Sequence, residues 1–232
     1  MLLDFFLPRK CVHCDEPCGK DSKSDEQLKN YLCGICFRKL ELLLPPNEDD
    51  LTSKCSLLSK YGEVQIIAPF PFMHDDLTQA IVHHFKYNDM PKLAGYVGEY
   101  IVERIDVTEY DYLIPIPLHG TRFAERGYNQ SEMLSKGIAR RTKTALAPNN
   151  WFKRIKQTPS QIGLSPDQRE ENMRGAFALT QKGKENLKGK QALIVDDVMT
   201  TGATLASAVE TLLEVQPAKI GVLAFATVVD PF

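Results

Sequence analysis

The chain has 232 residues, of which 43% are apolar and 25% are charged, so it is long enough for one mid-sized folded domain with a small appendage. Its formal net charge of -2 gives no indication of a polyanionic partner at the level of the whole molecule. No apolar run approaches the roughly 20 residues that a membrane-spanning helix needs, so we expect no membrane span.

The first eight residues carry a short apolar patch that contains Asp4 and is not preceded by basic residues. A secretory signal peptide needs a basic segment followed by a longer apolar one, so we reject that interpretation and expect a cytoplasmic protein. Thiols stay reduced in the cytoplasm. The six cysteines are therefore expected to be metal ligands, nucleophiles or ordinary core residues.

Four of the cysteines form two pairs near the N-terminus, Cys11 with Cys14 and Cys33 with Cys36, with 18 residues between the pairs. This spacing lies within the range of four-cysteine zinc sites. Each pair can point two thiolates at one ion, and tetrahedral Zn²⁺ with four sulfur ligands has no open position for water. The pattern predicts a structural zinc ribbon, in which the metal supplies folding energy that so small a segment lacks.

Two other readings of the cysteine pairs remain open, namely a cluster of plain buried thiols and a redox pair. The redox reading is disfavoured because neither pair opens a strand–helix–strand unit. Cys18 and His13 are alternative metal ligands, although the paired spacing favours the other four. Cys55 is expected to be an ordinary thiol.

The chain divides into three parts on composition. Residues 1–45 form the zinc ribbon and end in a short apolar helix at residues 40–44. A proline pair followed by acidic residues then indicates a linker, and residues 46–69 form this linker or hood segment. Residues 70–232 form the main domain.

Strands and helices alternate along the main domain and the segment just before it. The expected strands cover residues 66–72, 112–116, 192–195 and 220–229. The expected helices have apolar positions at a spacing of three or four and cover residues 77–85 (capped by Asp75 or Asp76), 93–105, 131–141 and 204–215. Such alternation predicts an α/β fold, with a parallel sheet flanked by helices on both faces.

Residues 155–174 contain several Pro and Gly and few apolar side chains, so we expect a long loop there. A long loop inside a compact domain is usually functional. Its candidate ligand contacts are Arg154, Lys156 and Arg169, although any one of them read alone is a solvated basic side chain.

The most informative motif is the run of residues 195–205, VDDVMTTGATL. An apolar strand ends in Asp196 and Asp197, and a Thr-Gly turn then opens a helix. A helix N-terminus presents backbone N–H groups that suit a phosphate, and Gly202 allows close approach of the backbone. The two carboxylates suit the hydroxyls of a ribose, so the motif indicates a ribose-5-phosphate site at the carboxyl end of a parallel strand.

At these residues the sequence resembles the phosphoribosyltransferase superfamily, whose members bind phosphoribosyl pyrophosphate (PRPP). The resemblance implies that Asp196 and Asp197 are the catalytic pair and hold the ribose 2- and 3-hydroxyls. It also implies that five consecutive residues wrap the 5-phosphate, namely Thr200, Thr201, Gly202, Ala203 and Thr204. Mg²⁺ accompanies PRPP, and a loop closes over the reacting centre.

Further motifs follow in a fixed order over nearly the whole chain, beginning with the two cysteine pairs. The others are LIPIPLH at residues 113–119, RGYNQS at 126–131, Arg154 with Gln157 and Gln161, Arg169 with Asn172 and Gly175, and the 195–205 run. Together they resemble the ComF/GntX family. The resemblance implies a type I phosphoribosyltransferase-like domain preceded by a small zinc ribbon.

The family resemblance also implies that the segment after residue 117 binds the diphosphate. Leu118, His119 and Arg122 would face it, as would Gly120 between them. Arg126 would contact the diphosphate or brace the loop, and Asn129 allows the same two readings. Lys86 is read as a solvated lysine at a helix end, with a reach to the phosphates as the alternative.

ComF-type relatives are associated with natural competence, so the resemblance implies a PRPP-binding protein that acts in single-stranded DNA uptake with competence-machinery proteins. Residues 120–175 hold 11 Lys and Arg against 5 Asp and Glu and form the candidate DNA-binding segment. The candidate stripe comprises Arg140, Arg141, Lys143, Lys153 and Arg154, with Tyr128, Trp151 and Phe152 as stacking faces. The alternative for Trp151 and Phe152 is that they are core residues, which such side chains more often are.

The alternative function is an active phosphoribosyltransferase in nucleotide salvage, which displaces pyrophosphate from PRPP with a nitrogen acceptor. Mg²⁺ would neutralise the leaving diphosphate, and the acidic pair would stabilise positive charge on the ribose ring. The sequence gives no recognisable pocket for an acceptor base, and a purely structural scaffold is the third reading.

Overall fold

The computed structural model describes residues 9–18, 27–47, 51, 57–73, 76–87, 90–156 and 165–229. Cys55, Asp75, Gln157 and Gln161 lie outside these ranges, and so do the sequence expectations that involve them.

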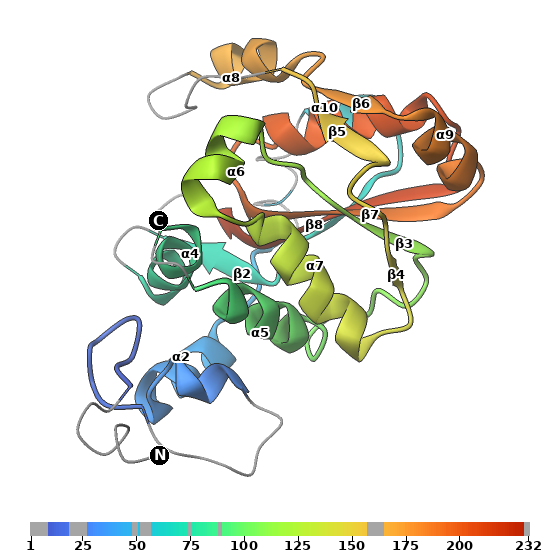
Figure 1. The fold of residues 1–232 in the computed structure, drawn as a ribbon. Coiled ribbons are helices and arrows are strands. Elements are labelled where there is room, and N and C mark those ends of the chain that lie inside the picture. Colours follow the sequence, from blue (N-terminus) through green and yellow to red (C-terminus); the bar gives the residue numbers. More distant parts are fainter. Residues whose placement is uncertain are drawn as a thin grey trace.

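In the part of the chain that the structure describes, six strands form one sheet in the order β1–β8–β7–β3–β4, with β2 also on β8, and every pairing is parallel (Figure 1). The strands are β1 (Gln65–Ile67), β2 (Phe70–Phe72), β3 (Tyr112–Pro115), β4 (Ala145–Leu146), β7 (Gln191–Met199) and β8 (Lys219–Val228). The predicted parallel sheet is confirmed.

The strand expected at residues 66–72 is divided into β1 and β2, which pair with successive parts of β8. Ala68 and Pro69 separate them, and a proline has no N–H to donate to a sheet ladder. β1 lies in the 46–69 segment, so this segment contributes a strand to the sheet.

The helices and 3-10 turns lie around this sheet. They are η1 (Gln27–Asn30), α2 (Gly34–Leu42), η2 (Ser59–Tyr61), α4 (Leu77–Tyr87), α5 (Pro91–Ile101), α6 (Gly120–Arg126), α7 (Gln130–Arg141), α8 (Pro166–Met173), α9 (Gln181–Leu187) and α10 (Ala203–Leu213). None of those helices is long and apolar enough to cross a bilayer.

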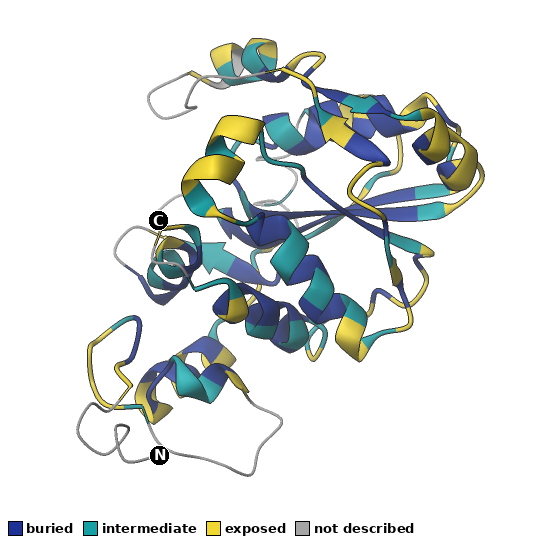
Figure 2. Cartoon of the chain, viewed as in Figure 1, coloured by how far each residue is buried: buried dark blue, intermediate teal, exposed yellow. Residues whose placement is uncertain are grey.

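Successive side chains of β7 enter two separate cores. Leu193 and Val195 pack in the core that includes α4, α5 and α7, whereas Ala192 and Ile194 pack in the core that includes α10. Adjacent residues of a strand point to opposite faces, so an all-apolar strand must be covered on both sides. The sheet therefore has helices on both faces, as the sequence predicts, and Figure 2 shows the buried strands between them.

The N-terminal part shares its core with the main domain. Leu28, Leu32, Phe37 and Leu40 belong to the same buried cluster as the residues of α4 and α5. The guanidinium of Arg104 donates to the carbonyls of Leu40, Glu41 and Leu43 and so satisfies the C-terminal end of α2. α2 begins directly after Cys33, earlier than the helix expected at residues 40–44.

The expectation of an unstructured loop at residues 155–174 is wrong for its second half, where α8 lies. Ser165 and Gln168 form a capping box at its start, and the Ser207 hydroxyl donates to the Met173 carbonyl at its end, 2.6 Å away. The helix has almost no apolar periodicity, because Met173 alone is both apolar and buried among its described side chains, those of residues 168–173. Periodicity could therefore not reveal it, whereas the capping pattern could.

A second sheet of two antiparallel strands, β5 (Phe152–Arg154) and β6 (Phe177–Leu179), brackets α8. It places Arg154 at the base of the segment that leads to α8. The segment that the sequence marked as functional is thus held at both ends by regular structure.

Helices α5 and α7 approach each other through glycines. A Cβ added to Gly137 would lie 1.9 Å from the carbonyl oxygen of Gly95, a separation that no folded chain tolerates. The atoms nearest to the added Cβ belong to the backbone of α5, so the clash can be removed only if the two helices move apart.

We therefore predict that Gly137→Ala lowers the free energy of unfolding by roughly 1–3 kcal/mol, as overpacking does elsewhere. Urea unfolding of the variant measures this. Gly120→Ala is the matched control, because Gly120 also lies in a helix but its added Cβ meets nothing within 4 Å. Equal unfolding midpoints for the two variants would contradict the α5–α7 contact.

Candidate functional site

The acidic pair lies buried at the carboxyl end of β7. Asp196 and Asp197 are 9% and 4% exposed. The hydroxyl of Ser131, at the start of α7, donates to Asp196 Oδ1 at 3.0 Å, and the Asp197 amide donates to the same oxygen at 2.9 Å. The ammonium of Lys86, on α4, lies 3.0 Å from Asp197 Oδ1. Three elements that are distant in the sequence therefore meet at two adjacent carboxylates.

Burial and the neighbouring Asp197 carboxylate raise the pKa of Asp196 to about 7. The Asp197 amide, Lys86 and Ser131 favour the ionised form and offset part of that rise. Two adjacent carboxylates this deep in the protein gain from further hydrogen-bond donors. Hydroxyl groups of a ligand are donors of that kind.

The turn after β7 is shaped as the sequence predicts. Gly202 has a φ of 73°, in the left-handed region, and caps the N-terminus of α10. Ala203 is the first residue of that helix and Thr204 the second. Arg169 of α8 donates to the Thr200 hydroxyl at 3.2 Å, so α8 reaches over the turn.

Two buried oxygens at this site have no hydrogen-bond partner among the residues that the structure describes. They are Asp197 Oδ2 and Thr201 Oγ1. A buried polar atom without a partner costs free energy, so natural proteins keep such atoms mainly where a ligand or ion completes them. One of these atoms belongs to the acidic pair and the other to the Thr-Gly turn, and both lie in the 195–205 motif.

The segment after β3 forms a second side of the candidate site, next to the acidic pair and the turn into α10. His119 caps α6 by accepting from the Thr121 amide at 3.4 Å, and its Nδ1 lies 2.9 Å from the Thr121 hydroxyl. Leu118 and Arg122 beside it are partly exposed. Burial and the nearby Arg122 lower the pKa of Arg154, while the Asp196 carboxylate raises it, so the Arg154 guanidinium lies within electrostatic range of Asp196.

Asn129 braces this segment. Its side chain is 8% exposed, donates to the Ile116 carbonyl at 2.9 Å, and accepts from the Ser131 amide at 3.0 Å. Of the two readings that the sequence left open for Asn129, the geometry gives the bracing one. Arg126 lies over the ring of Tyr87, 5.0 Å from its centroid, which ties α6 to the end of α4.

A cleft of about 260 Å³ opens beside these segments, between the ends of β3 and β5 and helices α6 and α7. Its lining is mostly apolar and includes Leu118, Phe123 and Phe152. Glu132, Lys153 and Arg154 provide its charged groups.

The four paired cysteines come together at the N-terminal module. The sulfurs of Cys11, Cys14, Cys33 and Cys36 lie within 4.8 Å of one another. Cys14 Sγ is 3.6 Å from Cys33 Sγ and 3.5 Å from Cys36 Sγ. Four sulfurs at ~2.3 Å from a tetrahedral zinc would be about 3.8 Å apart, so the cluster has the size that such an ion requires.

The alternative ligands do not join the cluster. Cys18 is outside the group of four, and burial raises the pKa of its thiol to about 11. His13 Nδ1 lies 3.3 Å from Cys36 Sγ and can hydrogen-bond a ligand sulfur from outside. For Cys11, hydrogen bonds from Cys33, His13 and Cys14 outweigh the effect of burial and lower the pKa to about 7, which favours the thiolate.

The expected stacking faces for DNA are wrong for Trp151 and Phe152, which are buried. The Trp151 ring packs 5.2 Å from Tyr112, and the Phe152 ring stacks 5.1 Å from Phe177. Tyr128 is half-buried, and its hydroxyl donates to the Phe85 carbonyl.

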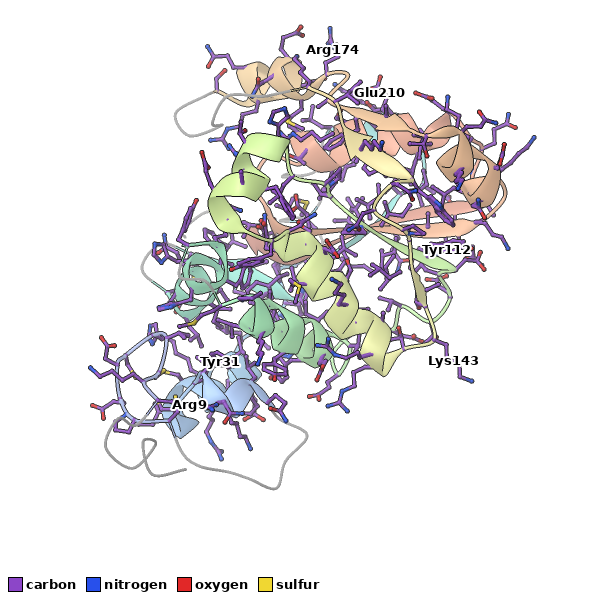
Figure 3. The ribbon with its side chains drawn as sticks, in the orientation of Figure 1. Arg9, Tyr31, Tyr112, Lys143, Arg174 and Glu210 are labelled. Atoms are coloured by element: carbon purple, nitrogen blue, oxygen red, sulfur yellow. The ribbon has the colours of Figure 1, made fainter. Side chains whose placement is uncertain are left out.

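The expected basic stripe is also divided. Arg140 and Arg141 at the end of α7 both pair with Glu99. Lys143 follows them and precedes β4, at the amino end of the sheet, and Figure 3 shows it well away from β5. Lys153 and Arg154 lie on β5 instead. The five residues thus form no continuous surface.

Comparison with known proteins bears on the same segments. The phosphoribosyl transferase domain family matches residues 87–230. Competence protein F of Haemophilus influenzae is 37% identical over 220 residues, which cover 88% of this chain and 90% of that protein. The chain belongs to the ComF family of the phosphoribosyltransferase superfamily.

More distant relatives share only part of their length with this ComF-family chain. The DNA utilization protein YhgH of Salmonella typhi is 28% identical over 140 residues, 57% of this chain and 60% of that protein. Competence protein ComFC of Bacillus subtilis is 25% identical over 146 residues, 62% of this chain and 56% of that protein. In both cases the chain spans less than two thirds of the relative.

Sequence reasoning does not assign two residues their place at the acidic pair. It reads Ser131 only as the start of a helix, and Lys86 as a solvated helix end or a contact of the phosphates, whereas the structure places both against the carboxylates. Both contact the acidic pair across a large separation in the chain, so no local pattern reveals them. A lysine that ends an otherwise apolar amphipathic helix was the available signal for Lys86.

We predict that the purified protein contains about one zinc per chain, because the four-sulfur cluster has the size and donors of a closed zinc site. Metal analysis by mass spectrometry measures it. Cys33→Ser is expected to lose the metal and to lower the melting temperature, because the module shares a core with α4 and α5. Cys18→Ser, outside the cluster, should keep it. A folded wild-type protein without metal would exclude the site.

Proposed function

We propose that this protein binds PRPP at the carboxyl end of β7 and acts in DNA uptake during natural competence. The observation that carries the first half is the pair of orphaned buried oxygens, Asp197 Oδ2 and Thr201 Oγ1, on either side of the turn into α10. They offer an acceptor for ribose hydroxyls and a donor for phosphate within one motif.

In the proposed complex the 5-phosphate lies against the turn at residues 200–204, where Gly202 brings the backbone N–H groups of α10 close. Asp196 and Asp197 accept hydrogen bonds from the two ribose hydroxyls. The diphosphate lies along the segment of Leu118, His119 and Arg122, with Arg126 at its far end.

Mg²⁺ fits this arrangement as a companion of the ligand. It prefers oxygen ligands, and the phosphate oxygens of PRPP supply them next to the 118–122 segment. When bound, the ion neutralises charge on the diphosphate. Zinc is the metal that we propose for the four cysteines, and reduced thiols at that site are consistent with a cytoplasmic protein.

The role in competence rests on family membership. The relatives cited above are two competence proteins and a DNA utilization protein, and none of these names refers to a nucleobase. Single-stranded DNA and proteins of the competence machinery are the proposed partners. The divided basic residues described above give no support for a DNA path across α7, so contact with DNA would lie elsewhere on segment 120–175.

An active transferase is the second candidate, and one observation favours it. The cleft of about 260 Å³ beside the proposed diphosphate segment has apolar walls and charged groups at its edge, as small-molecule sites do. In that reaction a nitrogen of the acceptor forms a bond to ribose C1 while the bond from C1 to the diphosphate oxygen breaks. The acidic pair would stabilise the positive charge that develops on the ribose.

Calorimetric titration of PRPP with Mg²⁺ tests the proposed site. We predict saturable binding to the wild type, weakened at least about 10-fold by Asp197→Asn, because hydrogen bonds to charged groups contribute roughly 1.5–3 kcal/mol. Asp106→Asn is the matched control, since Asp106 is exposed and bonds only locally to Thr108. A folded wild type that does not bind PRPP would overturn the proposal.

Once the protein is shown to bind PRPP, the two functional candidates predict different results. An active transferase releases pyrophosphate from PRPP when nucleobases or amines are supplied as acceptors. A competence protein without transferase activity binds PRPP without turnover, and single-stranded DNA binding weakens as salt increases. Pyrophosphate release that Asp197→Asn abolishes would decide for the enzyme.

A further inference from the structure

Lys86 lies half-buried against the acidic pair, and nothing in the 195–205 motif predicts this contact. Its side chain is 20% exposed, and that of Asp197 is 6% exposed. The ammonium and the Val198 amide both donate to Asp197 Oδ1, at 3.0 and 2.6 Å. Because Oδ1 has two donors and Oδ2 has none, the carboxylate presents a single open acceptor atom.

The helix that carries Lys86 is fixed at this position by its neighbours. The Phe85 carbonyl accepts from the Tyr128 hydroxyl at 2.5 Å, and the Tyr87 ring lies under the Arg126 guanidinium. Three consecutive residues of α4 therefore contact three parts of the site: the α6–α7 turn, the acidic pair and the end of α6. A solvated helix end has no such set of contacts.

The positive charge of Lys86 offsets electrostatic repulsion at the acidic pair. Two adjacent buried carboxylates repel each other, and PRPP brings several more negative charges beside them. Arg154 is a cation whose pKa the Asp196 carboxylate raises, so its influence falls on the other carboxylate of the pair. Among the described residues, Lys86 alone forms an ion pair with Asp197. A buried charge of this kind is retained only when it is paired.

We propose that Lys86 is a positioning residue of the PRPP site, which acts through Asp197. Its ammonium holds Oδ1 so that Oδ2 faces the ribose hydroxyl, and it places a positive charge 3.0 Å from Asp197 Oδ1. This proposal rests on the proposed function, since it assigns a residue to the same site. No bond to Lys86 forms or breaks in it.

The test is a double-mutant cycle on PRPP affinity, measured by calorimetry with Mg²⁺, using Lys86→Met, Asp197→Asn and the double variant. Lys86→Met keeps the apolar stem and removes the charge, and we expect it to weaken PRPP binding at least about 10-fold. Lys86→Arg keeps the charge and should recover most of the affinity. In the Asp197→Asn background, Lys86→Met should add less than about a 2-fold loss, because its partner is gone.

Lys39→Met is the matched control. Lys39 also forms a 3.0 Å ion pair with a mostly buried carboxylate, that of Asp76, which directly precedes α4 and so lies at the opposite end of the helix from Lys86. Its PRPP affinity should equal that of the wild type. Thermal unfolding of every variant verifies folding, and Lys86→Gln replaces Lys86→Met if the latter does not fold.

The outcomes separate the two proposals. A wild type that binds PRPP together with an unaffected Lys86→Met overturns the role of Lys86 alone. Losses that multiply in the double variant also overturn it, because they would place Lys86 on the ligand independently of Asp197. A wild type that does not bind PRPP overturns the proposed function and the assignment of Lys86 with it.

Discussion

Two adjacent carboxylates buried at the end of a strand are the constraint around which the site is arranged. Burial without hydrogen-bond partners would destabilise both carboxylates, and it raises the pKa of Asp196. Donors from three elements hold them instead: Ser131 from α7, Lys86 from α4, and the backbone amides of β7 itself. Even so, burial keeps the pKa of Asp196 at about 7, so the pair retains a demand for further donors. A polyol with a charged phosphate meets that demand at the adjacent turn.

Helix α4 connects this constraint to the metal module. Directly before its first residue, Asp76 pairs with Lys39 of α2. Near its end, burial lowers the pKa of His84, and a hydrogen bond with the backbone of Val12, which lies between two of the paired cysteines, partly offsets this effect. Lys86 then reaches the acidic pair from the last turn. The cysteine module thus supports the helix that positions Lys86, which gives a physical reason for a small metal-stabilised module to accompany this domain.

The features that were predictable from the sequence are those whose chemistry is local. The cysteine pairs, the buried strand before Asp196 and the turn at Gly202 each lie within a few residues, so spacing and residue type suffice. The contacts of Lys86 with Asp197 and of Arg169 with Thr200 join distant segments, and the fold alone brings them together. α8 lacked an apolar stripe, and Trp151 and Phe152 lie beside basic residues in the sequence but inside the core in space.

The most direct test of this account is a crystal structure of the protein with PRPP and Mg²⁺. The account predicts the 5-phosphate against residues 200–204, a ribose hydroxyl within hydrogen-bond distance of Asp197 Oδ2, and Lys86 still paired with Oδ1. Density for PRPP in the cleft between β3, α6 and α7, with the acidic pair left without contact to the ligand, would contradict it.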